Sequence, residues 1–144
     1  MKIIIKNLQK KIPIIPKKVK SVALKVLSFE HIKKSGEITI CFVDDKTIKG
    51  LNSKYLGRNT ATDVLAFDIS EQGDPGNIFA DIIISTDTAI RNAGIYKATK
   101  LGELYLYVIH GMLHILGYKD NNARNSSAMR QKEEYLCQYL KAKR

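Results

Sequence analysis

The sequence predicts an α/β domain of the α+β-like kind, in which about five helices pack on a small mixed sheet of about four strands. Short apolar runs with strand patterning alternate with segments of helical spacing. Their order is not the regular alternation of a doubly wound sheet, which favours a mixed sheet. The length of 144 residues, 44% of them hydrophobic and 26% charged, fits one globular domain over residues 1–144.

The first half of the chain is predicted to form two strands and two helices. In order, these are a strand at Lys2–Asn7, a helix over about Lys17–His31, a strand at Glu37–Val43 and a short helix from Asp44 or Asp45 to about Tyr55. The first helix is predicted by apolar residues at helical spacing, and the second strand by alternation of Ile38, Ile40 and Phe42. Asp44 or Asp45 supplies a carboxylate cap for the short helix.

The second half is richer in helices. In order, we expect a strand at Val64–Asp68, a polar loop at Ser70–Asn77, a strand at Phe79–Ser85, a helix from Thr86 or Asp87 to about Tyr96, a helix at Leu101–Leu116 and a last helix from about Ser126 to Leu140. The helix at Leu101–Leu116 has the strongest pattern, and Gly117 directly after it is suited to a left-handed cap.

The overall charge and the two cysteines narrow the function classes. The net charge of +10 favours a polyanionic partner, which could be RNA, DNA or the ribosome. No run approaches the ~18 apolar residues of a membrane span, and no glycine-rich phosphate loop is present, so neither a membrane nor a nucleotide cofactor is expected. Cys41 and Cys137 lack ligand-like spacing and there is no export signal, which favours a cytoplasmic protein with free thiols. The oligomeric state is not predicted.

The chemistry is concentrated in the run His110-Gly-Met-Leu-His114-Ile-Leu-Gly-Tyr-Lys-Asp120. Two histidines four residues apart on a helix lie on the same face, so both imidazoles can reach one metal ion. Gly117 allows the chain to turn back, and Asp120 can then supply a third ligand. Three protein ligands with a fourth position for water are typical of a catalytic zinc site. A chance pair of histidines is the alternative, but unpaired imidazoles in this apolar helix would be costly.

The neighbouring residues restrict the type of metal enzyme. Peptidases of the zincin type need a glutamate directly after the first histidine, where this chain has Gly111. Glu103 lies seven residues before His110 and therefore on the same helix face. It could orient a ligand or accept a proton from water at the metal, or it could serve only as a first-turn acid at the helix N-terminus.

The motif resembles the signature of the YbeY family of bacterial endoribonucleases, His-Gly-x-Leu-His-Leu-x-Gly-Tyr-Asp-His. The matching positions here are His110, Gly111, Leu113, His114, Gly117 and Tyr118. Residues 51–67 are similar to the family segment Leu-Asn-x-x-Tyr-Arg-Gly…Thr-Asp-Val-Leu-Ser-Phe, and Asp81–Ser85 is similar to its Gly-Asp-Ile-x-Ile-Ser strand. Met129 with Glu133 and Glu134 fits the closing helix, so the likeness covers about residues 40 to 140.

The chain departs from the family pattern at two positions. Asp120 stands where the family has its third metal histidine. An aspartate remains a zinc ligand, but it adds negative charge and can widen tolerance for harder ions such as Mn²⁺. Leu56 stands where the family usually has a functional arginine, and Arg58 could reach the same space as a phosphate clamp or be a plain turn residue.

The resemblance implies a metal-dependent, single-strand-specific endoribonuclease that acts in late rRNA processing, at the 3′ end of 16S rRNA, and in ribosome biogenesis. The expected cofactor is one zinc ion per chain, and the expected partners are rRNA and the ribosomal small subunit. Two other functions stay open. One is a non-catalytic ribosome-assembly factor with a structural metal, and the other is a metal-dependent hydrolase of a small non-nucleic substrate.

Overall fold

The strands and helices follow one another in the order expected from the sequence, in a computed structural model that describes residues 1–70 and 76–142. The strands are β1 (Lys2–Asn7), β2 (Ser35–Val43), β3 (Val64–Asp68) and β4 (Asn77–Ser85). The helices are α1 (Pro16–Phe29), α2 (Asp45–Leu56), α3 (Thr86–Ile95), α4 (Lys100–Ile115) and α5 (Ala123–Ala142). Within the described residues, these elements confirm the predicted α/β domain with a four-stranded mixed sheet and five helices. Residues 71–75 of the predicted polar loop Ser70–Asn77 lie outside the described residues.

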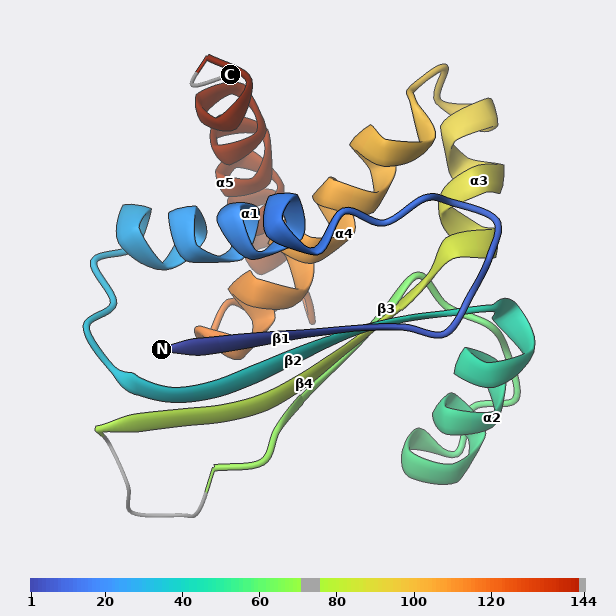
Figure 1. Cartoon of the computed structure of the whole chain (residues 1–144), viewed down its shortest axis with the longest axis horizontal. Helices are drawn as coiled ribbons and strands as arrows, with labels where there is room; N and C mark the ends of the chain where they lie inside the picture. The colour runs from blue at the N-terminus through green and yellow to red at the C-terminus, as the bar shows by residue number, and fades with distance from the viewer. Residues whose placement is uncertain (71–75, 143–144) are drawn as a thin grey trace.

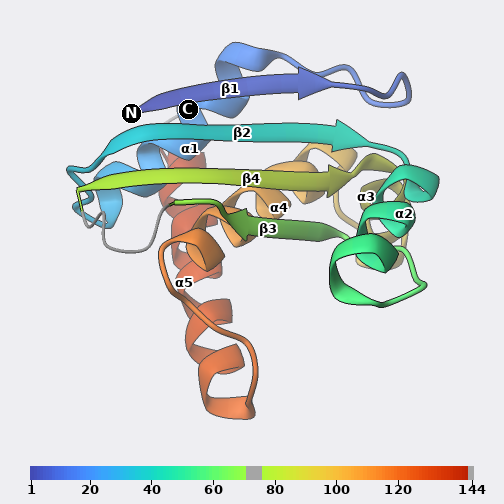
Figure 2. The same cartoon turned by 90° about the horizontal axis from the view of Figure 1, so that it is seen from below.

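The sheet has the strand order β1-β2-β4-β3 and is mixed (Figure 2). β1 pairs parallel to β2, and β2 pairs parallel to β4, so that Ile3, Ile38 and Ala80 lie in one row across three strands. β3 closes the other edge antiparallel to β4, with Val64 opposite Ile84. The three parallel strands therefore share one direction, and β3 returns against them.

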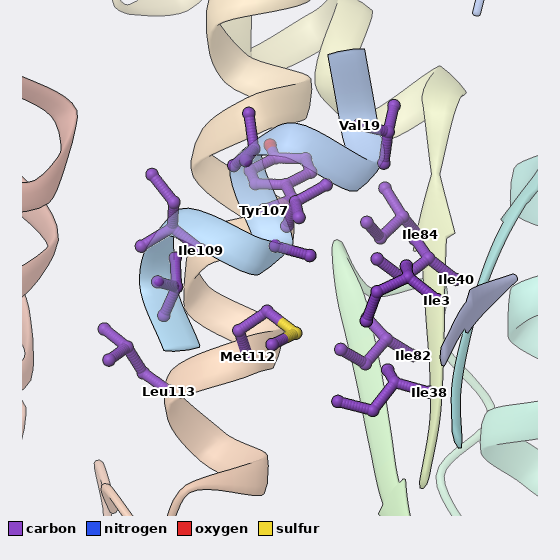
Figure 3. Close-up of a cluster of buried hydrophobic side chains, with 14 of the residues drawn as sticks. Ile3, Val19, Ile38, Ile40, Ile82, Ile84, Tyr107, Ile109, Met112 and Leu113 are labelled. Atoms are coloured by element: carbon purple, nitrogen blue, oxygen red, sulfur yellow. The ribbon is translucent and has the colours of Figure 1, made fainter. Parts of the chain in front are cut away.

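Four helices lie on one side of this sheet and α2 lies on the other (Figure 1). The main core forms where α1 and α4 cover the sheet, because alternate strand residues and one face of each helix are apolar. In Figure 3, Met112 of α4 points toward the isoleucines of β2 and β4. The completely buried strand side chains in this core are Ile38, Ile40, Phe42, Ile82 and Ile84.

Polar contacts join the start of α2 to the end of β4 and to the first two turns of α3. Asp44 caps α2 by accepting a hydrogen bond from the Thr47 amide at 2.8 Å. Asp45 accepts hydrogen bonds from the hydroxyls of Ser85 at 2.6 Å and Thr88 at 2.8 Å, and it pairs with Arg91 at 2.5 Å. These contacts fix the position of α2, which, among the described helices, lies on the opposite side of the sheet from the others.

The observed boundaries differ from the predicted ones where tertiary contacts decide. α1 ends at Phe29, because His31 takes a left-handed φ of 56° and the chain turns toward β2. β2 and β4 each begin two residues earlier than predicted, because Ser35 pairs with Asn77 at the start of their ladder. Gly117 has the expected positive φ, at 102°. None of the described helices is long and apolar enough to cross a membrane.

Candidate metal centre

The site is built on α4, whose N-terminus is capped by Thr99 through a 2.9 Å hydrogen bond from the Gly102 amide. The inner face of the helix is buried against the sheet and α1 through Leu104, Val108, Ile109, Met112 and Leu113. His110 and His114 lie at the border of this face and keep about a quarter of their side-chain surface exposed. The helix therefore holds both imidazoles firmly while leaving each open on one side.

Gly111 sets how closely α4 approaches the sheet. A Cβ atom at this position would lie 2.6 Å from Cγ2 of Ile82 and 3.2 Å from Cγ1 of Val64. Both distances are shorter than ordinary van der Waals contact, so the helix backbone lies directly on β3 and β4. The glycine between the two histidines thus fixes the depth at which the histidines sit.

The turn after α4 brings the third candidate ligand back to the histidines. The amide of Gly117 donates to the His114 carbonyl at 3.1 Å, and the amide of Tyr118 donates to the Leu113 carbonyl at 3.0 Å. With its positive φ, Gly117 completes a reversal that few other residues allow. Oδ2 of Asp120 consequently lies 3.6 Å from Nε2 of His114.

The three side chains present their ligand atoms to one point. The Nε2 atoms of His110 and His114 are 3.0 Å apart, and one ligand atom from each of the three residues lies within 4.8 Å of the others. Tetrahedral zinc with ligands at about 2.1 Å places neighbouring ligand atoms about 3.4 Å apart. The observed separations bracket this value, so the residues fit a divalent ion. Asp120 is half-exposed, which leaves the site open toward solvent on that side.

The outer nitrogens of both imidazoles are already occupied. Nδ1 of His114 is 3.1 Å from the carbonyl oxygen of Tyr118, and Nδ1 of His110 hydrogen-bonds the carboxylate of Glu133 in α5. A carbonyl or carboxylate accepts only, so each Nδ1 carries a hydrogen and each Nε2 can present a lone pair. At 3.0 Å the two Nε2 atoms can share one proton, or both can turn their lone pairs to a metal ion that takes its place.

The electrostatic surroundings of His110 favour a positive charge. Burial lowers the pKa of His110, but the hydrogen bond and the charge of Glu133 outweigh burial, and the net pKa is raised. Asp63 and Asp120 add weaker contributions in the same direction. Asp63 directly precedes β3, where its carbonyl accepts a hydrogen bond from the Ser85 amide at 2.9 Å. The charges of three carboxylates thus act on His110.

Arg58 lies in the turn between α2 and β3 and is exposed. Asn52 holds this turn: its carbonyl accepts a hydrogen bond from the Arg58 amide at 3.3 Å, and its side-chain amide donates to the Thr60 carbonyl at 2.9 Å. The same turn continues to Asp63, whose charge acts on His110. Arg58 is therefore on a segment that leads to the candidate metal centre, and its clamp role stays a prediction.

Glu103 is buried in the first turn of α4. Seven residues separate it from His110, which corresponds to about 10 Å along the helix axis. Its charge acts on Tyr107, whose pKa is raised chiefly by burial and also by Glu103. The carboxylate that hydrogen-bonds His110 belongs to Glu133, so a role for Glu103 in the chemistry stays a prediction.

Two contacts of the site were not predicted from the sequence. Glu133 reaches His110 from twenty-three residues away, and the Tyr118 carbonyl orients His114. The family resemblance places Glu133 in the closing helix, but it does not indicate which residue Glu133 contacts. Only the packing of α5 beside α4 identifies His110 as that partner.

Comparison with known proteins identifies the family of the chain. The family model described as "Endoribonuclease YbeY" matches residues 4–141. The endoribonuclease YbeY of Syntrophus aciditrophicus is 38% identical over 141 residues, covering 94% of this chain and 88% of that protein. The endoribonuclease YbeY of Petrotoga mobilis is 36% identical over 146 residues, covering 100% and 99%.

A solved structure gives the same result for the fold. The solution structure of a Thermotoga maritima protein superimposes with a TM-score of 0.65 at 26% identity, and the match covers 94% of this chain and 86% of that one. A family model that matches nearly the whole length and relatives above 30% identity show the family. The chain belongs to the endoribonuclease YbeY family.

Proposed function

We propose that this protein is a metal-dependent, single-strand-specific endoribonuclease that acts in late rRNA processing, at the 3′ end of 16S rRNA, and in ribosome biogenesis. The observation that carries the proposal is the convergence of His110, His114 and Asp120 in a member of this family. The proposed partners are rRNA and the ribosomal small subunit, and the proposed location is the cytoplasm.

The proposed cofactor is one zinc ion per chain, held by Nε2 of His110, Nε2 of His114 and a carboxylate oxygen of Asp120. When bound, a divalent ion there supplies Lewis acidity toward a phosphoryl oxygen and lowers the pKa of water. The aspartate also makes another divalent ion, such as Mn²⁺, an acceptable occupant. Glu133 and the Tyr118 carbonyl keep the two imidazoles in the orientation that binding requires.

Other residues of the chain would handle the RNA itself. The guanidinium of Arg58 is exposed and can pair with phosphate oxygens, which would stabilise negative charge that develops during cleavage. Glu103 is proposed as a further acidic residue of the reaction, acting from the first turn of α4. The net charge of +10 would hold the RNA backbone through its phosphates, with an affinity that falls as salt rises.

The test begins with the purified protein, its bound metal measured by elemental analysis, and a 16S precursor RNA as substrate. We expect cleavage that is lost with a chelator and lost in His114→Ala, and restored to the chelated wild type by zinc. Because a contaminating ribonuclease would survive His114→Ala, this variant also controls the preparation. Arg58→Ala should lower kcat on the order of tenfold to hundredfold without changing bound metal. The matched control is Lys49→Ala, which removes one exposed positive charge from α2.

A second candidate is a ribosome-assembly factor in which the metal only fixes the structure around α4. Two observations favour it: Leu56 replaces the arginine usual in the family, and Asp120 replaces the histidine. A metal-loaded protein that leaves the precursor RNA intact, and whose His114→Ala variant unfolds, would establish this function instead. If His114→Ala and Asp120→Ala both keep their full metal content, the metal site itself is misassigned.

A further inference from the structure

The loop that carries Asp120 is held from outside by two other elements. The hydroxyl of Tyr118 donates a hydrogen bond to Oε1 of Glu30 at 3.0 Å, and Nζ of Lys132 lies 3.5 Å from the same oxygen. Glu30 directly follows the last residue of α1, and Lys132 belongs to α5. We refer to Glu30, Tyr118 and Lys132 as the Glu30 clasp, since together they join α1, the loop after α4 and α5.

The clasp is packed as well as hydrogen-bonded. The ammonium of Lys132 lies 5.3 Å from the ring centre of Phe29 and 6.0 Å from that of Tyr118, distances at which cation–π attraction contributes. The ring of Phe29 in turn packs against the rings of Tyr135 and Tyr139 of α5, with ring centres 5.2 and 5.5 Å apart. The glutamate and the lysine are mostly buried, at 16% and 30% exposure, so their attraction is less screened than that of a surface pair.

The loop between α4 and α5 is also held at its far end, where Oδ1 of Asn121 accepts a hydrogen bond from the Asn125 side-chain amide at 2.8 Å and the Asn122 carbonyl accepts one from the Ser126 amide at 2.9 Å. Up to Tyr118 it is held by the backbone hydrogen bonds that end α4. Within the described residues, Lys119 and Asp120 make no backbone hydrogen bond. The position of Asp120 therefore depends on how Tyr118, two residues earlier, and Asn121, directly after it, are fixed.

Tyr118 also connects the clasp to a histidine. Its hydroxyl reaches Glu30, while its carbonyl oxygen is 3.1 Å from Nδ1 of His114. Lys132 and Glu133 are neighbours in α5, and the first holds the clasp while the second hydrogen-bonds His110. Each candidate ligand is thus linked to the clasp. His114 contacts the Tyr118 carbonyl, His110 contacts the neighbour of Lys132, and Asp120 follows Tyr118 by two residues.

We propose that Glu30, Tyr118 and Lys132 are positioning residues for the metal centre: they hold the loop so that Asp120 and the Tyr118 carbonyl meet His114 in the geometry that binds the ion. This inference rests on the metal centre of the proposed function. Outer partners of metal ligands typically change metal affinity by about tenfold to hundredfold when removed.

The test uses Co²⁺ as the probe, because both its affinity and its visible absorption spectrum report on ligand geometry. Tyr118→Phe removes only the hydroxyl that reaches Glu30. The matched control is Tyr107→Phe, which removes a similarly placed hydroxyl: it accepts a 2.7 Å hydrogen bond from Asn92 and lies on α4 away from the loop. Both variants lose one tyrosine hydroxyl and its hydrogen bonding, so a general loss of stability affects both.

We expect Tyr118→Phe to bind Co²⁺ about tenfold more weakly than wild type and to change its spectrum, while Tyr107→Phe changes only the thermal midpoint. Glu30→Ala also removes the ion pair with Lys132, so it should weaken binding at least as much as Tyr118→Phe. The double variant should cost no more than Glu30→Ala, since the contact of the Tyr118 hydroxyl is already lost in that variant. Glu30→Gln keeps an oxygen acceptor for the hydroxyl and should recover most of the affinity.

Two outcomes would overturn the inference. One is wild-type Co²⁺ affinity and spectrum in Tyr118→Phe, and the other is an equal loss of affinity in Tyr107→Phe. A wild-type protein that binds neither Co²⁺ nor Zn²⁺ gives a third, distinct result, because it removes the metal centre of the proposed function and the clasp's role with it.

Discussion

The carboxylate of Glu133 hydrogen-bonds Nδ1 of His110, although the two residues belong to different helices. This contact gives α5 a direct part in the candidate metal centre, because it sets the orientation and the tautomer of one imidazole. It also raises the pKa of His110 against the opposing effect of burial. A helix that supplies none of the three candidate ligands can therefore control how well they bind.

Replacing Glu133 by glutamine should weaken metal binding about tenfold to hundredfold, because an amide is a weaker acceptor and carries no charge. Competition with a chelating dye measures the affinity. Glu134→Gln is the matched control, since Glu134 is the next residue of α5 and is exposed. Equal affinities of the two variants would show that the contact to His110 does not tune the site.

Asp120→His should shift the metal preference toward zinc. The wild-type carboxylate is a hard oxygen ligand and adds a negative charge, which favours Mn²⁺ more than a third imidazole does. We expect the ratio of Zn²⁺ to Mn²⁺ affinity to rise on the order of tenfold in the variant. Titration of both proteins with each ion measures the ratio, and an unchanged ratio would mean that Asp120 does not contact the metal.

Gly111→Ala should lower the free energy of unfolding. The added methyl would lie 2.6 Å from Cγ2 of Ile82, and overpacking of this kind costs about 1–3 kcal/mol. The higher helix propensity of alanine offsets at most about 1 kcal/mol of this loss of stability. Gly50→Ala in α2 is the opposite case, because nothing lies within 4 Å of its added Cβ, and it should gain roughly 0.5–1 kcal/mol. Urea denaturation compares the two, and a Gly111→Ala protein as stable as wild type would refute the close approach.

Asp45→Asn should destabilise the protein by about 1–2 kcal/mol at neutral pH, by weakening the hydrogen bonds from Arg91, Ser85 and Thr88. Burial raises the pKa of Asp45, but these hydrogen bonds outweigh it, and the net pKa lies below the ordinary 3.8. A carboxyl group with a lowered folded pKa adds stability above its unfolded pKa and loses it as the pH falls through the folded value.

The stability gap between wild type and Asp45→Asn should therefore be full at neutral pH and shrink below about pH 4. Urea denaturation at several pH values measures this gap. Glu134→Gln serves as the control for loss of an exposed acid and should show little gap at any pH. A gap that stays constant between neutral and strongly acidic pH would contradict the assigned hydrogen bonds.

The sequence was sufficient wherever the relevant contacts are local. The spacing of His110 and His114 follows from helix periodicity, and the turn toward Asp120 follows from Gly117. The strand at Val64–Asp68 was predicted with its observed bounds, because its apolar run is flanked by turn residues.

Contacts between distant segments could not be predicted in the same way. The partner of Glu133 depends on how α5 packs beside α4, and the contact of Glu30 with Tyr118 spans eighty-eight positions. The early start of β2 at Ser35 depends on its pairing with β4 and has no pattern of its own. Helical or strand periodicity identifies which face of an element is buried, but it contains no information about which neighbour covers that face.

The close fit of Gly111 against Ile82 has a consequence for how this protein can diverge. Any lineage that acquires a side chain at position 111 must also acquire a smaller one at position 82, or lose packing. The metal-binding motif and a strand far upstream are thus expected to covary among descendants. Selection on the metal-binding helix α4 therefore also restricts which side chains β4 can carry in the core.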